Sequence, residues 1–140
     1  EQYYAHPQNC FWRLMEDLLA IDRCLPYRER LTSLLDSGYG LWDVIKNCQR
    51  ATSLDADIVS SSVEVNDFMQ FFRTHQNIRA IYFNGAKAEA VFKRHVLSPL
   101  PSTSQWPDII MKRLPSTSPA HAALDYQAKL DLWREILQGR

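Results

Sequence analysis

Two asparagines and one segment rich in hydroxyl groups are the residues of this chain best suited to chemistry. Asn9 lies just before the first stretch with helical periodicity, and its amide carbonyl could orient a water molecule, although an amide is no general base. Asn84 follows a predicted strand, and its amide presents a hydrogen-bond donor beside an acceptor. Hydroxyl and backbone N–H groups of Ser116, Thr117 and Ser118 could bind phosphate oxygens. These residue types suit positioning and recognition.

Each of these groups also has a purely structural interpretation. Asn9 could be a helix N-cap, because asparagine is favoured there. Asn84 could be a left-handed turn residue before Gly85. The Pro- and Ser-rich segment 115–124 could be a simple connector. The residues alone leave both interpretations open at all three places.

Hydrophobic periodicity predicts the helices that must position these groups. One follows Asn9, with an apolar face made of Phe11, Leu14, Met15, Leu18 and Leu19. One spans 27–37, ends at Gly38 and turns three leucines inward: Leu31, Leu34 and Leu35. A short one is capped by Asn66 or Asp67 and carries Phe68, Phe71 and Phe72. Another follows Gly85 with Ala88, Val91 and Phe92 on one face. The last is capped by Asp125 and turns inward Tyr126, Leu130, Trp133 and Leu137.

Three apolar, β-prone runs predict strands at 41–45, 78–83 and 109–114, and the polar stretch 46–65 predicts a long loop. Strands that alternate with helices indicate an α/β fold with a parallel sheet covered on both faces. Ligands bind such sheets at the carboxyl ends of the strands. This rule points to the residues after Ile45, to Asn84 and to the segment from Pro115.

The composition is that of one globular domain over residues 1–140. The chain is 46% hydrophobic and 23% charged, which excludes a disordered or low-complexity chain. No apolar run is long enough for a membrane span, and we expect no signal segment within these residues. Three cysteines without Cys-x-x-Cys spacing argue against a disulfide framework or a metal site. Sixteen basic residues balance sixteen acidic ones, so the total charge does not indicate nucleic-acid binding, although it permits a local basic patch.

Four segments together resemble one known family. They are YYAHPQNCFW (residues 3–12), LWDV (41–44), FNG (83–85) and LPSTSPAHA (114–122). Their order and spacing are similar to those of the hypoxanthine-DNA glycosylases, a branch of the uracil-DNA glycosylase superfamily. The likeness extends from Tyr3 to Trp133, and the first and last segments are its most specific parts.

The resemblance implies a three-layer α/β/α sandwich around a short, four-stranded parallel sheet. Family members carry a strand and a Gly/Pro-rich loop just before the Tyr-Tyr segment. This chain begins after that element, so we expect an N-terminally incomplete domain over 1–140 that lacks the first strand.

The resemblance also assigns roles to individual residues. Asn9 and His121 are the expected catalytic residues. Asn84, Tyr4 and Asp43 are expected to bind the base. For Tyr4, stacking on the base competes with packing against the edge of the sheet, and Asp43 could instead anchor neighbouring groups. The residues expected to contact DNA are Ser116, Thr117, Ser118, Ala120 and His121.

The activity implied by the resemblance is hydrolysis of the N-glycosidic bond of a flipped, deaminated base in DNA repair. Hypoxanthine is the expected base, and the product is an abasic site. No lysine falls in a matching motif position, so we expect a monofunctional enzyme without a lyase step. The expected partner is double-stranded DNA with a deaminated base, bound by a monomer without cofactor, metal or membrane. The expected location is the cytoplasm, at the nucleoid, or a eukaryotic nucleus.

Two alternatives remain open at this level. One is an enzyme of the same kind that removes uracil or mismatched bases, because one amide can recognise the edge of either base. The other is a non-catalytic DNA-binding module derived from a degenerate or truncated glycosylase. An unrelated α/β hydrolase is disfavoured, since the chain has no Gly-x-Ser-x-Gly elbow.

Overall fold

The computed structural model of the chain describes residues 4, 6–42, 45–47, 64–65, 74–98, 109–120 and 123–138. Two compact units divide the chain. Unit 1 comprises Glu1–Leu41 and Leu114–Arg140, and unit 2 comprises Trp42–Arg113. The sequence-based expectation of a single domain stays a prediction.

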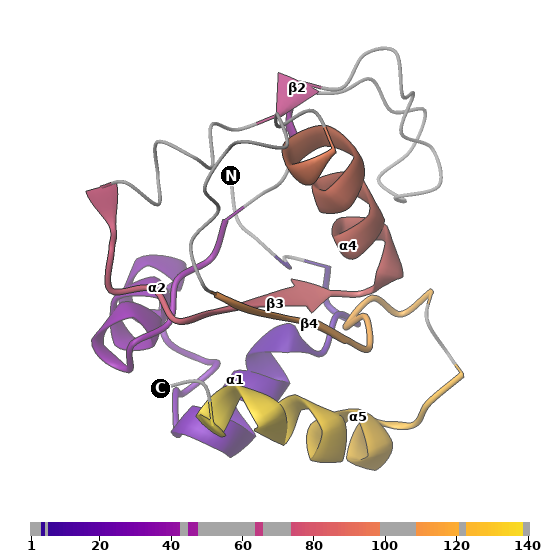
Figure 1. The fold of residues 1–140 in the computed structure, drawn as a ribbon. Helices are drawn as coiled ribbons and strands as arrows, with labels where there is room; N and C mark the ends of the chain where they lie inside the picture. Colours follow the sequence, from indigo (N-terminus) through magenta and orange to yellow (C-terminus); the bar gives the residue numbers. More distant parts are fainter. Residues whose placement is uncertain are drawn as a thin grey trace. The chain divides into compact units, whose positions relative to one another are not determined.

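Unit 1 is helical, with α1 (Phe11–Leu19), α2 (Tyr27–Asp36) and α5 (Tyr126–Trp133), and α5 continues into a 3₁₀ helix, Arg134–Gln138 (Figure 1). The apolar face of α1 packs as its periodicity predicts, and its buried residues are Phe11, Trp12, Leu14 and Met15. Aromatic rings join α1 to the other helices. Phe11 meets Trp133 edge to face at 6.0 Å between ring centroids, and Trp12 meets Tyr27 at 6.1 Å.

The ends of the helices in unit 1 follow their capping residues. Asp125 accepts a hydrogen bond from the backbone N–H of Ala128 at 2.8 Å, so it caps α5 as predicted. Gly38 has a φ of 94° and stops α2, also as predicted. The following Tyr39 hydroxyl donates to the carbonyl of Ile136 at 2.7 Å and so ties the end of α2 to the C-terminal 3₁₀ helix.

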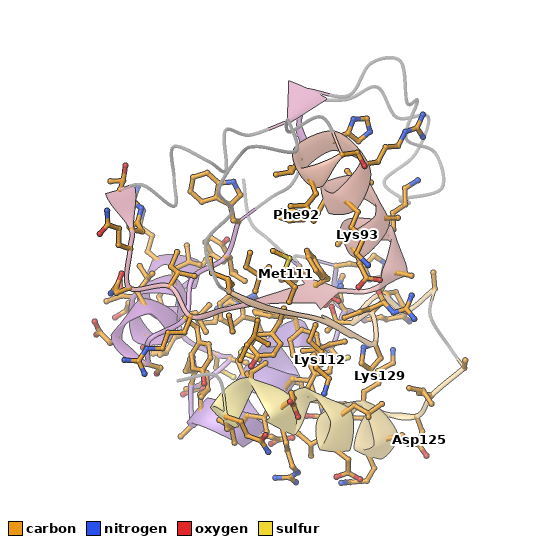
Figure 2. The ribbon with its side chains drawn as sticks, viewed as in Figure 1. Phe92, Lys93, Met111, Lys112, Asp125 and Lys129 are labelled. Carbon is orange, nitrogen blue, oxygen red and sulfur yellow. The ribbon has the colours of Figure 1, made fainter. Side chains whose placement is uncertain are left out.

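Unit 2 contains β1 (Ile45–Asn47), β2 (Glu64–Val65), β3 (Ala80–Asn84) and α4 (Ala86–Phe92), and α4 continues into a π-helical turn, Lys93–Leu97. Its β3 pairs in parallel with β4 (Ile110–Leu114), which ends at the first residue of the second part of unit 1. Helix α4 covers one face of this pair, as Figure 1 shows. Phe92 from α4 and Met111 from β4 lie on that same side (Figure 2). Their cluster is centred on Phe83, Phe92 and Val96.

The α/β class is confirmed, and two predicted elements need correction. The expected buried strand 41–45 is wrong at its start, since Trp42 is 46% exposed and the strand begins at Ile45. The expected loop 46–65 is also wrong at both ends, because β1 pairs with β2 in antiparallel register, Ile45 opposite Val65. The bounds of β1 and β2 therefore follow from the pairing of their backbones and not from the apolar run 41–45.

Other expectations for the fold have mixed outcomes. Leu35 was expected to face inward on α2, but it is 65% exposed. Among the leucines of α2, only Leu34 is buried. The helix expected after Asn66 falls on residues outside the described ones. The three layers and the four-stranded sheet with its missing first strand stay predictions.

Candidate functional site

One pocket of unit 1 contains a residue that the sequence singled out. It has a volume of about 340 Å³, and Asn9 forms part of its wall. Three arginines line it, Arg13, Arg23 and Arg30, together with His6, Pro7 and Trp12. The segment before α1, the helix itself, the turn after it and α2 each contribute to the pocket. All of these residues belong to unit 1.

The backbone at the start of α1 fixes the Asn9 side chain. Its Oδ1 accepts a hydrogen bond from the backbone N–H of Phe11 at 3.0 Å, while Cys10 occupies the N-cap position itself. The helix thus begins one residue later than the N-cap interpretation of Asn9 assumes, yet the amide still satisfies a backbone donor of the first turn. An amide oxygen has two lone pairs, so Oδ1 can accept a second hydrogen bond. Structural and chemical roles are compatible here.

His6 and Pro7 enter the pocket through a turn that ends at Asn9. The backbone N–H of Asn9 donates to the His6 carbonyl at 2.9 Å, and the backbone N–H of Gln8 donates to His6 Nδ1 at 3.1 Å. Because Nδ1 accepts, the neutral ring carries its proton on Nε2. The turn therefore fixes both the ring and the amide that follows it.

The segment from Leu114 to Ala120 lies against the residues around Asn9. The backbone N–H of Cys10 donates to the Thr117 carbonyl at 3.1 Å. Trp133 Nε1 donates to the Pro115 carbonyl at 2.8 Å and holds the same segment to α5. Two segments that the sequence matched to one family are thus joined directly.

Within this segment the side chains differ in accessibility. Thr117 is 1% exposed, so its side chain is part of the core of unit 1. Ser116 and Ser118 are half-buried and close two successive turns. Ser116 Oγ accepts from the Ser118 N–H at 3.1 Å, and Ser118 Oγ accepts from the Ala120 N–H at 3.2 Å. Burial of Thr117 favours a positioning role for that residue, while Ser116, Ser118 and Ala120 lie nearer the surface.

Tyr4 packs on helix α1, whereas the structural alternative expected it to pack against the edge of the sheet. Its ring stacks on Phe11 with 4.2 Å between centroids and 27° between planes. Its φ of 61° is the left-handed conformation, which costs a non-glycine residue about 1–2 kcal/mol. The stacking contact helps to offset that cost. A base-binding role for Tyr4 stays a prediction.

Asn84 is the last residue of β3 in unit 2 and is half-buried. The alternative in which Asn84 is a left-handed turn residue is wrong, because the positive φ belongs to Gly85, at 97° with a ψ of 168°. Such a combination is essentially restricted to glycine. Gly85 thus turns the chain from β3 directly into α4, and Asn84 stays at the carboxyl end of its strand, where α/β sheets bind ligands.

Two predicted site residues, Asp43 and His121, lie outside the described part of the chain. Asn9 and the Ser116–Ala120 segment come together within unit 1, whereas Asn84 belongs to unit 2. The roles of all these residues stay predictions.

Sequence reasoning missed the arginines of the pocket. Arg13 follows Asn9 by four residues, a helical spacing that could have drawn attention to it. Arg23 and Arg30 lie on other elements, and no local spacing links them to Asn9. Among the described residues, no group of three or more His, Cys, Asp or Glu side chains could hold a metal ion. None of the described helices is both long and apolar enough to cross a membrane.

Cys10, next to Asn9, is a poor nucleophile. Burial raises the pKa of its thiol, although the charge of Lys129 acts in the opposite direction. A thiol with a raised pKa is protonated at neutral pH and unreactive. The polar groups that line the pocket include the Asn9 amide, the His6 ring and the three guanidinium groups.

Two curated proteins are similar to the chain, and both are named hypoxanthine DNA glycosylase. The one from Methanosarcina barkeri is 36% identical over 88 residues, which are 62% of this chain and 54% of that protein. The one from Methanosarcina acetivorans is 37% identical over 89 residues, which are 63% of this chain and 55% of that protein. The chain thus spans about half the length of the curated relatives it matches.

No family model matches the chain, and no solved structure matches it significantly. The names of the two relatives nevertheless agree with the family that the four sequence motifs resemble.

Proposed function

We propose that this protein is a DNA glycosylase that hydrolyses the N-glycosidic bond of a deaminated base, with hypoxanthine as the principal substrate. The observation that carries the proposal is the hydrogen bond from the Cys10 N–H to the Thr117 carbonyl. It joins the Asn9 segment to the Ser116–Ala120 segment, two of the four segments that resemble the family. The names of both relatives agree with the same activity.

In the proposed mechanism, Asn9 acts on the attacking water. Cleavage of a glycosidic bond develops positive charge on the sugar, so the protein needs to orient a water molecule more than it needs a strong nucleophile. The second lone pair of Asn9 Oδ1 accepts a hydrogen bond from that water. The bond from the Phe11 N–H holds the amide in place, so little orientation is lost at the moment of reaction. His121 would stabilise charge near the sugar.

Base recognition is assigned to Asn84 in this proposal. Hypoxanthine presents its O6 acceptor beside the N1–H donor, and one amide can pair with both. A flipped base would reach the carboxyl end of β3, as in other enzymes that extrude their target. Base-binding roles are also proposed for Asp43 and for Tyr4.

DNA contacts are assigned to the Ser116–Ala120 segment. Ser116 and Ser118 would offer hydroxyls to the backbone around the flipped nucleotide, and Thr117 would hold the segment in position. The enzyme would act as a monomer on double-stranded DNA, wherever the genome is housed, in the cytoplasm or a nucleus. It would leave the abasic strand uncut, because it would not form a Schiff base with the sugar.

The experiment that tests this function is a cleavage assay on labelled duplexes with one hypoxanthine, uracil or xanthine. The 140-residue chain and a version extended upstream are incubated with each duplex, and alkali-labile breaks are measured. We expect breaks chiefly at hypoxanthine. Absence of breaks from both chains, with binding to abasic DNA retained, would contradict the enzyme and favour a binding module.

A further inference from the structure

The pocket beside Asn9 concentrates positive charge in a chain whose formal net charge is zero. Three guanidinium groups line it, and among the described residues no aspartate or glutamate does. A cluster of this kind repels itself unless its charges are neutralised by side chains or by a ligand. The surroundings of each arginine show which of these applies.

Arg30 is held in place by contacts that, within the described part of the chain, include no carboxylate. Its Nε donates to the Leu25 carbonyl at 3.0 Å. Its Cζ lies 4.8 Å from the centre of the Trp12 ring and 5.5 Å from that of Tyr27. Among the described residues, no carboxylate lies within ion-pair distance of it. The group is rigid, half-buried and retains further N–H donors.

Arg13 is stacked in a similar way. Its Cζ lies 3.6 Å from the centre of the Tyr126 ring. Asp17, four residues along α1, would be its ordinary ion-pair partner. Instead, Asp17 accepts a hydrogen bond from the Tyr126 hydroxyl. Within the described ranges Arg13 therefore has an aromatic support and no carboxylate partner.

Arg23 differs from the other two. It pairs with Glu16 at 3.5 Å, and the two side chains are 50% and 36% exposed. Exposed pairs of this kind contribute little to stability and exchange partners readily. Arg23 thus contributes to the positive electrostatic potential of the pocket. Its contribution is smaller than that of a free guanidinium, because Glu16 partly neutralises it.

We propose that this arginine pocket binds a backbone phosphate of the DNA strand beside Asn9, with Arg30 and Arg13 as its principal ligands. Guanidinium groups fit phosphate oxygens in a bidentate manner, and rings that support them reduce the loss of side-chain entropy on binding. The identity of the strand as DNA rests on the proposed function. The phosphate chemistry rests on the pocket alone.

The chemistry of the proposed reaction also excludes the sugar as the direct target of these charges. An oxocarbenium-like sugar is positive, so unpaired guanidinium groups beside it would raise the barrier. A phosphate bound between the arginines and Asn9 removes this conflict. A volume of about 340 Å³ lies at the lower end of small-ligand pockets and suits a phosphate with its attached sugar.

The test measures binding without requiring catalysis. A fluorescent duplex with a stable abasic-site analogue is titrated with the full 140-residue chain at several salt concentrations. We expect Arg13→Gln and Arg30→Gln each to weaken binding about tenfold and to reduce the salt dependence by about one counterion. Arg28→Gln is the matched control, because it removes the same charge from an exposed site on α2 outside the pocket.

The comparison between the control variant and the two pocket variants decides whether the proposal holds. Equal effects of Arg28→Gln and the two pocket variants would overturn the proposal, since the effect would then be one of general charge. Arg30→Lys keeps the charge but loses the planar fork, and we expect it to recover only part of the binding. Thermal unfolding identifies a variant that fails to fold. Arg13→Gln, at an exposed side chain, keeps the test valid if Arg30 proves necessary for folding.

An NMR titration that follows the arginine Nε–H resonances distinguishes a phosphate of the DNA backbone from a free phosphate. We expect those of Arg13 and Arg30 to shift with the abasic duplex and only weakly with inorganic phosphate or deoxyinosine monophosphate. Strong shifts with the free phosphates alone would overturn the assignment to DNA. If the duplex binds through Arg13 and Arg30 but no base is ever released, the proposed function fails while the phosphate site stands.

Discussion

Asn9 and Asn84 carry the same amide, but different local structures hold them. Asn9 lies before a helix, and its own oxygen accepts a hydrogen bond from the Phe11 N–H. Asn84 ends a strand, and the conformation of Gly85 sets where the chain turns after it. A hydrogen bond thus orients the Asn9 side chain in unit 1, and the turn at Gly85 sets the position of Asn84 in unit 2.

This difference indicates which kind of work suits each residue. An amide whose oxygen is already oriented can present its second lone pair to a water molecule without rearrangement. An amide at a strand end carries a donor beside an acceptor, the pattern needed to recognise a base edge. A substitution at Asn9 should therefore lower the rate of base release, whereas a substitution at Asn84 should change the specificity for the base.

The largest expected effect is that of Asn9→Ala on base release. Loss of one preorganised polar group typically costs about a hundredfold to a thousandfold in rate. We expect a loss of that size in the single-turnover rate on a hypoxanthine duplex, with little change in duplex binding.

Asn9→Ser is its structural control, since serine can also accept the Phe11 N–H bond. We expect it to unfold at nearly the wild-type temperature while remaining as slow as Asn9→Ala. A serine variant with wild-type rate would contradict a role that requires the longer amide side chain of Asn9.

Asn84 should show a smaller effect that depends on the base. Removing two hydrogen bonds to the base, each contributing about 0.5–1.5 kcal/mol, should cost about ten- to a hundredfold in kcat/KM for hypoxanthine. Rates on hypoxanthine, uracil and xanthine duplexes should also become more alike in Asn84→Ala. An equal loss on every duplex would assign Asn84 to the structure of β3 instead.

Gly85→Ala tests whether the backbone indeed sets the position of Asn84. The φ of 97° at Gly85 is strained for alanine, and we expect a loss of about 1–3 kcal/mol in the free energy of unfolding. Gly40→Ala is the control, because Gly40 has no positive φ and a Cβ there would lie 3.8 Å from Leu35 Cδ2. Chemical denaturation of both variants should separate them, and equal stabilities would contradict the argument.

The smallest expected effect concerns Tyr126, which supports Arg13 beside the Asn9 pocket. Partial burial and the hydrogen bond to Asp17 raise the pKa of its hydroxyl well above the ordinary value of 10.0. The neutral phenol is thus favoured in the folded state, so its stabilising contribution is complete below pH 10 and is lost as the pH rises further. Tyr126→Phe should lose about 1 kcal/mol at neutral pH and show a shallower decline of stability above pH 10. Urea unfolding from neutral pH to about one unit above the ordinary tyrosine pKa measures this, and an unchanged slope would contradict it.

Much of the fold could be predicted because its signals are local. The spacing of apolar residues placed α1 to within its observed bounds, and Asp125 and Gly38 marked helix ends by their own chemistry. The ends of β1 were missed because they depend on pairing with Glu64–Val65, a partner remote in sequence. Sequence pattern does not encode that register.

The candidate site divides in the same way. Asn9 and the Ser116–Ala120 segment were found by motif, and the structure joins them through Cys10 and Thr117. Burial of Thr117 was not foreseen, because a polar side chain in a Ser-rich segment is ordinarily exposed. The arginine pocket was missed because helix packing, not sequence spacing, brings Arg13 and Arg30 together.

The central claim is that the protein releases an intact base by hydrolysis and that Asn9 orients the attacking water. The most direct test is chromatographic detection of free hypoxanthine from a deoxyinosine duplex, with the strand examined before any alkali treatment. We expect free hypoxanthine and an uncut abasic strand from the upstream-extended chain, and neither from its Asn9→Ala variant. Undiminished release by Asn9→Ala, or no release by the unaltered protein, would contradict the account.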